Sequence, residues 1–237
     1  MNLLNKLYIA LLLLLTFATG YKIIRYYGTP RYYYTASFTA PRTYPVFIHN
    51  SYFILPYNKM GIISDDNVND QRGTYWGAID VGGEADGKQQ LPLKLVMEYA
   101  SYRDRAFYRD TIDLPVEKMK TIFAGSKAKG IRKDLYVLNG SHNGDGLHFF
   151  IGVANNGNIK VWLQGRNYEE LLVKHHIQAA EPKGNQTFYG KKLSKNQFLD
   201  RVFSVDDDIK KDIEKGKERT ANYIDSASHY LETIRQK

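Results

Sequence analysis

An apolar run near the start of the chain constrains most strongly what this protein can be. After Lys6, residues 7–18 carry no charge and are dominated by leucine. A run of about twelve residues is close to the hydrophobic core of a signal peptide and shorter than the roughly twenty residues of a comfortable membrane-spanning helix. We therefore expect export, with residues 1–25 acting as a signal peptide or an N-terminal membrane anchor.

Three interpretations of this segment stay open. Ala18 and Gly20 are small residues two positions apart, so a signal peptidase could cleave before Tyr21. If residues 19–24 continue the helix and Lys22 extends to the headgroups, the segment becomes a marginal anchor. A buried helix of a soluble domain is the least favoured, because nothing nearby would pair with it.

The composition excludes several classes of protein. The chain of 237 residues has no cysteine, so it has no disulfides, no thiolate zinc site, no cysteine nucleophile and no cysteine-linked lipid. The 19 tyrosines and 11 phenylalanines suit a sheet-rich fold that is held by packing.

The formal net charge is +8, which would ordinarily suggest nucleic acid as a partner. Lysine and arginine are scattered among acidic residues, however, and the sequence has no recognised nucleic-acid motif. We expect no nucleic-acid partner. The basic surface fits anionic lipid headgroups or an acidic protein partner better.

Strand signals dominate residues 31–190. They fall at residues 31–40, 44–55, 74–81, 91–102, 135–139, 147–153, 159–163 and 171–178. Residues 44–55 predict a hairpin that turns at residues 49–51, and Asn155-Asn156-Gly157 predicts a tight turn between two later strands. The longest strand alternates along its length. One face carries Leu93, Leu95, Met97 and Tyr99, and the other, partly wet, carries Lys94, Val96, Glu98 and Ala100.

Helical signals are fewer. Pro115 and Glu117 suit the first turn of a helix that presents Met119, Ile122 and Phe123. Further candidates are a helical turn at residues 167–172, a short helix at 194–201 and an amphipathic helix at 205–236, with residues 58–73 as a polar surface loop. We therefore predict a β-rich α+β fold of antiparallel sheets, sandwich-like or strongly curved. Residues 31–190 would form this domain and residues 191–237 a C-terminal helical segment.

Histidine spacing does not predict a metal site. His175 and His176 are adjacent on a predicted strand, so their side chains point to opposite faces. His142 and His148 flank a glycine-rich turn and could approach each other, but no third ligand is near. The residues Asp65, Asn67 and Asn69 alternate as in a calcium loop. Asp70 and Trp76, however, occupy the positions that need glycine and glutamate. We expect no metal and no cofactor.

No motif predicts catalysis. The serines at Gly125-Ser126-Lys127 and Gly140-Ser141-His142 do not form the Gly-x-Ser-x-Gly motif of a nucleophile elbow, which needs a glycine two positions before and two positions after the serine. A carboxylate pair could come from Glu98, Asp104, Asp110 and Asp113, as it could from any wet strand face. The glycines at positions 82, 83 and 87 precede a strand rather than a helix, which excludes a phosphate-binding loop. We predict no catalytic residues.

Two functions remain as hypotheses, with a purely structural envelope component as a third. A non-catalytic binding protein would present an exposed patch, for which we predict Tyr102, Arg103, Asp104 and Arg105. The C-terminal helix could also dock a partner, although packing on its own sheet is favoured. An envelope hydrolase would instead bring at least two of four residues together in a pocket with shifted pKa values. Those residues are Glu98, Asp104, His142 and His148.

Several segments in order carry a family resemblance over residues 35–175. They are Ala40-Pro41 with Tyr44-Pro45-Val46, Trp76 before a glycine-rich turn, Leu91-Pro92-Leu93-Lys94-Leu95, Tyr99-Ala100-Ser101, Phe107-Tyr108, Ile112-Asp113-Leu114-Pro115 and the stretch from Ile151 to Gly165. With these motifs the chain resembles a bacterial family of cell-envelope proteins, many of them lipoproteins, named domain of unknown function 2931. The chain departs from the family at the leader, which has no lipobox cysteine. It also has Asn-Asn-Gly at the hairpin turn, where the family tends to have Pro-Gly-Gly.

The resemblance implies a location and, less directly, a role. It implies a periplasmic domain, either anchored in the inner membrane or released after signal cleavage, and not lipidated through cysteine. It brings no catalytic residues. Relatives resemble proteins found near secreted-toxin and type VI secretion loci. This implies a protein partner in the envelope and a possible immunity role against a toxin.

Overall fold

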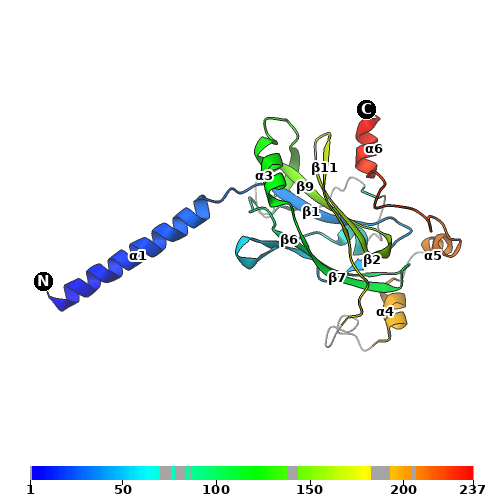
Figure 1. The fold of residues 1–237 in the computed structure, drawn as a ribbon, viewed down its shortest axis with the longest axis horizontal. Coiled ribbons are helices and arrows are strands. Elements are labelled where there is room, and N and C mark those ends of the chain that lie inside the picture. The colour runs from blue at the N-terminus through cyan, green and yellow to red at the C-terminus, as the bar shows by residue number, and fades with distance from the viewer. Residues whose placement is uncertain are drawn as a thin grey trace.

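The computed structural model describes residues 2–69, 76–77, 84–85, 87–137, 144–182, 193–203 and 207–236 (Figure 1). Its helices are α1 (Leu3–Tyr27), α2 (Asp66–Asn69), α3 (Val116–Gly125), α4 (Lys195–Val202), α5 (Asp207–Glu214) and α6 (His229–Arg235), with short 3₁₀ helices η1 (Pro56–Asn58) and η2 (Asn155–Gly157). Its strands are β1 (Tyr34–Thr39), β2 (Val46–Ile48), β3 (Tyr52–Leu55), β4 (Lys59–Gly61), β5 (Glu84–Ala85), β6 (Lys94–Ser101), β7 (Ala106–Asp113), β8 (Lys133–Val137), β9 (Gly144–Val153), β10 (Asn158–Gly165) and β11 (Tyr168–His176).

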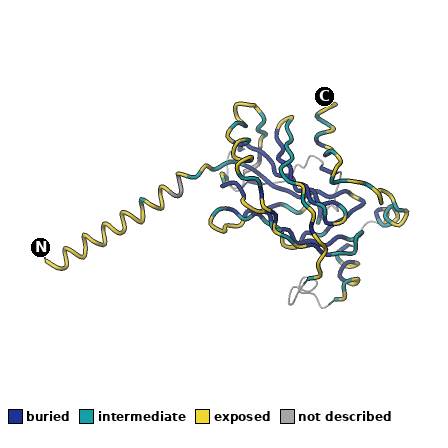
Figure 2. The backbone as a smooth tube through the Cα atoms, viewed as in Figure 1, coloured by how far each residue is buried: buried dark blue, intermediate teal, exposed yellow. Residues whose placement is uncertain are grey.

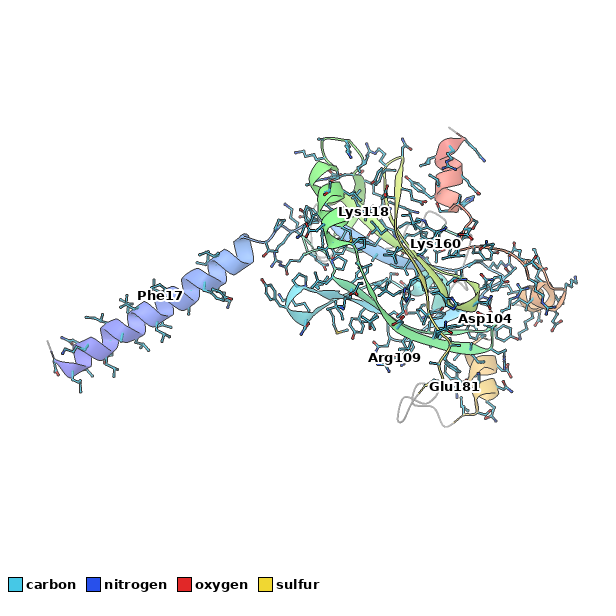
Figure 3. All side chains as sticks on the ribbon, viewed as in Figure 1. Phe17, Asp104, Arg109, Lys118, Lys160 and Glu181 are labelled. Atoms are coloured by element: carbon cyan, nitrogen blue, oxygen red, sulfur yellow. The ribbon has the colours of Figure 1, made fainter. Side chains whose placement is uncertain are left out.

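The helix α1 stands apart from the β-rich domain. Every residue from Leu3 to Ile24 except Gly20 is exposed, and the side chain of Phe17 projects freely from the helix (Figures 2 and 3). The 22 residues from Leu3 to Ile24 are long and apolar enough to cross a membrane, by length and composition. The segment is therefore compatible with a signal peptide or a membrane anchor. The interpretation as a buried helix is wrong, because the domain does not cover it.

The larger sheet has six strands, in the order β11-β10-β9-β8-β5, with β1 added on β9. The strand β1 runs parallel to β9, whereas β10 is antiparallel to both of its neighbours, β9 and β11. The predicted turn between β9 and β10 is confirmed. Asn156 and Gly157 have φ values of 56° and 75°, which this tight turn requires. The predicted helical turn at residues 167–172 is wrong, because all of these residues except Asn167 belong to β11.

The smaller sheet is centred on β6, which pairs with β7 on one edge and with both β2 and β3 on the other. The predicted hairpin within residues 44–55 is therefore wrong. The strands β2 and β3 run in the same direction along one edge of β6, and residues 49–51 between them form a bulge instead of a turn. The strand β4 completes this sheet by pairing with β3.

Isolated bridges join the two sheets at both margins. Ser37 of β1 pairs with Ser64 beyond β4, and Tyr108 of β7 pairs with Ala179 beyond β11. The curved sheets thereby enclose one shared core, to which the fully buried Phe38, Leu95 and Phe149 belong. This arrangement confirms the predicted β-rich α+β class with curved antiparallel sheets.

The helix α3 covers the end of the domain at which β1 begins. Met119 and Phe123 are buried in the shared core, and the ring of Phe123 lies 4.9 Å from that of Tyr32. The sequence predicted this helix and its apolar side correctly. Pro115 directly precedes its first residue.

The C-terminal segment is helical but not one continuous helix. Ser194 begins α4 with the capping box that its partner Gln197 completes. The predicted helix at residues 205–236 is interrupted between α5 and α6. Gly216 there has a φ of 75°, which an α-helix does not allow. The predicted strand at residues 74–81 lies largely outside the described residues.

Candidate functional site

The outer face of the smaller sheet is only half covered by the rest of the chain. Alternation along β6 directs Leu95, Met97 and Tyr99 inward, as predicted. On the outward side, Ala100 of β6 and Phe107 of β7 pack under α4 and α5, in a cluster with Phe198, Leu199, Phe203 and Ile209. The face of β6 that we predicted to be partly wet is therefore covered by α4 and α5 at its Ala100 end.

The other half of this face is open, and apolar apart from the ion pair of Lys94 with Asp113. We call it the open face and define it by five outward-facing residues of β3, β4 and β6 and the position after β4. They are Tyr52, Ile54, Met60, Ile62 and Val96. Met60 is 67% exposed and Ile62 is 74% exposed. Outside α1, only Tyr57 and Leu93 among the described residues are also large, apolar and exposed. A cluster of this kind is typical of an interaction surface.

The bulge between β2 and β3 borders the open face. The amides of His49 and Asn50 both donate to the carbonyl of Glu98, at 2.9 and 3.4 Å. The hydroxyl of Ser51 accepts from the Glu98 amide at 2.9 Å. The bulge leaves a shallow cavity of about 190 Å³, lined by residues 48–52, 60–63 and 65. Bulges commonly redirect side chains next to functional sites.

Charged side chains lie along the same border. The buried carboxylate of Glu98 is 3.7 Å from Nε of Arg109, whose side chain lies on the outside of β7 (Figure 3). His49 lies at the surface beside them. Partial burial lowers the pKa of His49, and the nearby carboxylate of Glu98 opposes this shift. An apolar centre with a polar border is the usual composition of a protein-binding surface.

The predicted interaction patch, residues 102–105, forms the turn between β6 and β7 and contacts the chain's own C-terminal segment. The guanidinium of Arg103 lies 4.4 Å from the ring centre of Tyr44 and donates to the Lys217 carbonyl at 2.7 Å. Arg105 donates to Asp200 at 2.9 Å. Tyr102 packs against Phe203, with ring centres 5.3 Å apart. A partner at this turn stays a prediction.

Asp104, the remaining residue of this patch, joins the two sheets. Its carboxylate accepts from the Tyr108 hydroxyl at 3.2 Å and from the Asn156 amide at 2.9 Å. Burial first, and then the Asp104 charge and hydrogen bond, raise the pKa of Tyr108. Asp104 thus fastens the β9–β10 turn to β7.

The residues of the hydrolase hypothesis have separate partners. Glu98 pairs with Arg109 on the smaller sheet, and Asp104 binds the β9–β10 turn. His148 lies buried on the larger sheet, where Thr35 and Ser37 hold its ring. Their hydroxyls are 2.5 Å from Nδ1 and 2.9 Å from Nε2. Burial lowers its pKa well below the ordinary value. His142 lies outside the described residues.

The described residues contain no group of three potential metal ligands. His175 contacts Asp110 at 2.7 Å, whereas His176 contacts Asn158 at 3.1 Å, so the prediction that they face apart is confirmed. In the calcium-like loop, the Asn69 amide donates to Asp65 at 2.6 Å and to the Ile48 carbonyl at 2.9 Å. Asn69 therefore positions β2. Asp70, the next residue of that loop, lies outside the described residues.

The sequence signal for the open face was present but weak. Met60 and Ile62 belong to residues 58–73, which we predicted as a polar loop. The alternation of Met60, Gly61 and Ile62 indicates a short strand with one apolar side. Only the pairing of β4 with β3 shows that this side continues Ile54.

Comparison with known proteins gives one match. A family model described as "Protein of unknown function (DUF2931)" matches residues 22–228. This match is longer than the residues 35–175 that carry the resemblance and includes α4 and α5. No curated protein and no solved structure matches the chain.

Proposed function

The chain belongs to the DUF2931 family of proteins of unknown function, and we propose that it is a non-catalytic protein-binding module held at a cell-envelope membrane by α1. The observation that carries this proposal is the open face. Its exposed Met60 and Ile62 continue a half-buried apolar surface on a rigid sheet, bordered by Glu98 and Arg109. A rigid apolar surface with a charged border suits a protein partner.

The arrangement of the ionisable residues favours binding over catalysis. Glu98, Asp104 and His148 each have their own partners on different parts of the domain. Acid–base catalysis needs such groups within hydrogen-bonding reach of one reacting atom.

The length and exposure of α1 support its role as an anchor. The helix runs to Tyr27, well beyond the apolar run of residues 7–18. It therefore reaches the length of a bilayer core, with Lys22 near the end next to the domain. In this proposal the domain lies in the periplasm and α1 in the inner membrane.

The partner in this proposal is an envelope protein or a secreted toxin. In the second case the module is an immunity protein that covers the toxin's active site, as the family resemblance implied. The open face would then be the surface that covers it.

Position-specific crosslinking tests the binding surface. The chain has no cysteine, so Ile62→Cys provides a single attachment point for a photocrosslinker on the open face. We expect one crosslinked partner from Ile62→Cys and none from Asp208→Cys on α5. Adding Met60→Asp should reduce the yield at least tenfold, because a buried charge without a counter-charge strongly opposes association. Equal products from both positions, or no effect of Met60→Asp, would contradict the proposal.

A second measurement tests the anchor. After alkaline extraction of membranes, we expect the chain in the pellet, with an intact N-terminus by mass spectrometry. A soluble chain that begins at Tyr21 would show that α1 is a cleaved signal peptide. The binding proposal would survive this result, but the anchor would not.

The envelope hydrolase remains the second candidate, because His49 lines the cavity at the bulge and the charge of Glu98 acts on His49. It predicts hydrolysis of envelope material that Glu98→Gln abolishes and Asp113→Gln leaves unchanged. A purely structural component would show neither a partner nor an activity.

A further inference from the structure

One end of the domain is held close to the end of α1. Only residues 28–33 separate α1 from β1, and six residues span at most about 20 Å. Figure 1 shows α3 and the loop between β3 and β4 on the side of the domain from which α1 departs. We call this the α1-proximal end.

Four loops bring exposed basic residues to this end. Lys59 follows the loop between β3 and β4. Lys88 precedes Gln89, which pairs with Tyr32, two positions before the first residue of β1. The turn after α3 carries two more lysines, and the β10–β11 turn binds that segment through the Arg166 amide and the Ile131 carbonyl. The exposed basic residues are Lys59, Lys88, Lys127, Lys129 and Arg166.

These five residues form no ion pair with any described acidic residue. The neighbouring acidic residues are largely neutralised by other bases. Lys94 pairs with Asp113, Lys118 with Glu170, Lys120 with Glu117 and Arg132 with Asp145. Asp134 adds one exposed carboxylate. Among the described side chains, this end therefore retains a positive charge.

Two exposed apolar side chains lie among these bases. Tyr57, at 52% exposure, occupies the tip between β3 and β4. Leu93, at 37%, donates its amide to the Ile54 carbonyl where β6 begins. Tyrosine beside lysine is the composition found where proteins meet the headgroup layer of a membrane.

We propose that the α1-proximal end docks on the anionic headgroups of the membrane that holds α1, with Tyr57 and Leu93 in the interfacial layer. This inference rests on the proposed anchoring of α1. Basic residues attract anionic lipid within about a Debye length of a membrane surface, and the short linker lets the α1-proximal end approach the surface to that distance. The domain is then fixed against the bilayer instead of moving freely on its tether.

Fluorescence quenching on the full chain tests this inference. The full chain would carry a single cysteine with an environment-sensitive probe, reconstituted in vesicles with nitroxide-labelled lipid and about 30% phosphatidylglycerol. The probe positions are Leu13→Cys in α1, Lys59→Cys at the proximal end and Asp208→Cys on α5. We expect lipid quenching at positions 13 and 59 and none at 208.

Charge removal supplies the matched control. On the Lys59→Cys background, changing Lys88, Lys127 and Lys129 to Gln should reduce the quenching at least twofold, as should phosphatidylcholine vesicles. Changing Lys210, Lys211 and Lys215 near α5 to Gln removes the same charge and should have no effect. Quenching at position 13 without quenching at 59 would overturn the docking and leave the anchor standing. No quenching at 13 would overturn both.

Discussion

At the scale of single residues, Gly157 shows how closely the turns of this domain are packed. Its φ of 75° lies in the left-handed region, and its α-carbon lies against the Ile177 carbonyl and the Tyr108 ring. A side chain there would be strained and would also collide with both neighbours. The glycine thus lets the β9–β10 turn lie against the segment that joins the two sheets.

We expect Gly157→Ala to lower the free energy of unfolding by about 3 kcal/mol or more, from backbone strain and overpacking together. Gly130→Ala is the control. Gly130 has a φ of 62° but open space around it, so only the backbone cost of about 1–2 kcal/mol applies. Chemical denaturation of the detergent-solubilised chain measures both. Equal losses would show that the contacts at Gly157 are unimportant.

His148 makes stability depend on pH. Its ring is buried between two hydroxyls and stays neutral, so its pKa in the folded chain is well below the ordinary value of 6.5. The unfolded chain binds a proton there below about pH 6.5, but the folded chain does not. The stability that this residue contributes is therefore fully present above pH 6.5 and is lost as the pH falls.

We expect the wild-type chain to lose up to about 1.4 kcal/mol per pH unit between pH 6 and pH 5 through this residue. The variant His148→Gln can still hydrogen-bond to Thr35 and Ser37. Its free energy of unfolding should fall less steeply over the same pH range, by the amount that His148 contributes. Denaturation at pH 7, 6 and 5 gives the two slopes. Parallel slopes would mean that His148 is not the titrating group.

Residue-level predictions from the sequence succeeded where the cause is local. The opposite directions of His175 and His176 and the Asn-Asn-Gly turn follow from strand alternation and backbone preference. The contacts of residues 102–105 could not be predicted in this way. Arg103 reaches the Lys217 carbonyl across 114 positions, and no local pattern encodes that distance.

At the scale of elements, polar contacts hold the segment before α6 against β10 and β11. Lys160 donates to the Ser226 carbonyl at 2.6 Å, and the Ser228 hydroxyl donates to Glu169 at 2.5 Å. Burial raises the pKa of Glu169, and hydrogen bonds from Ser228 and Gln164 oppose it only in part. Burial in the docked state therefore shifts Glu169 toward its neutral form.

This raised pKa predicts that α6 docks more firmly as the pH falls toward the ordinary pKa of a glutamate. Docking through Glu169 is strongest below the ordinary pKa and weakens as the pH rises through the raised value. Amide exchange of α6, corrected for intrinsic rates, should show this dependence in the wild type. It should be absent in Glu169→Gln and retained in Glu170→Gln, since Glu170 pairs instead with Lys118. Retention in Glu169→Gln would contradict the assignment.

Elements with a strong local signal were predicted well. The strands β6, β9 and β10 and the helices α3 and α4 lie close to their expected positions, because alternation, Pro115 and the Ser194 cap define them. The pairing of β2 and β3 with β6 was missed. Turn-forming residues at a bulge have the same composition as those in a hairpin, and only the partner strand distinguishes the two.

At the scale of the whole molecule, both sheets share one core. Phe38 and Phe149 come from the larger sheet, and Leu95 and Phe53 from the smaller, and all are fully buried. Neither sheet can lose this contact without exposing the other, so we expect the domain to unfold as one unit.

Two probes should therefore give the same unfolding curve. The only two tryptophans, Trp76 and Trp162, lie with ring centres 5.1 Å apart on the outer face of the larger sheet, so their fluorescence reports that region. Far-ultraviolet circular dichroism reports all the secondary structure. We expect the two curves to have the same midpoint. Leu95→Ala, in the smaller sheet, should lower the free energy of unfolding that both probes report by about 2–5 kcal/mol. If Leu95→Ala left the midpoint of the fluorescence curve unchanged, the two sheets would unfold as separate units.

The parallel pairing of β1 with β9 determines when this domain can form during synthesis. Tyr34 is among the first residues after α1 to emerge, yet its strand partner Leu147 follows 113 positions later. Among the described residues nearer in the chain, β1 pairs only through the isolated bridge between Ser37 and Ser64. This strand therefore stays without its strand partner until more than half of the chain has been synthesised. This delay makes the nascent chain dependent on protection from aggregation until β9 arrives.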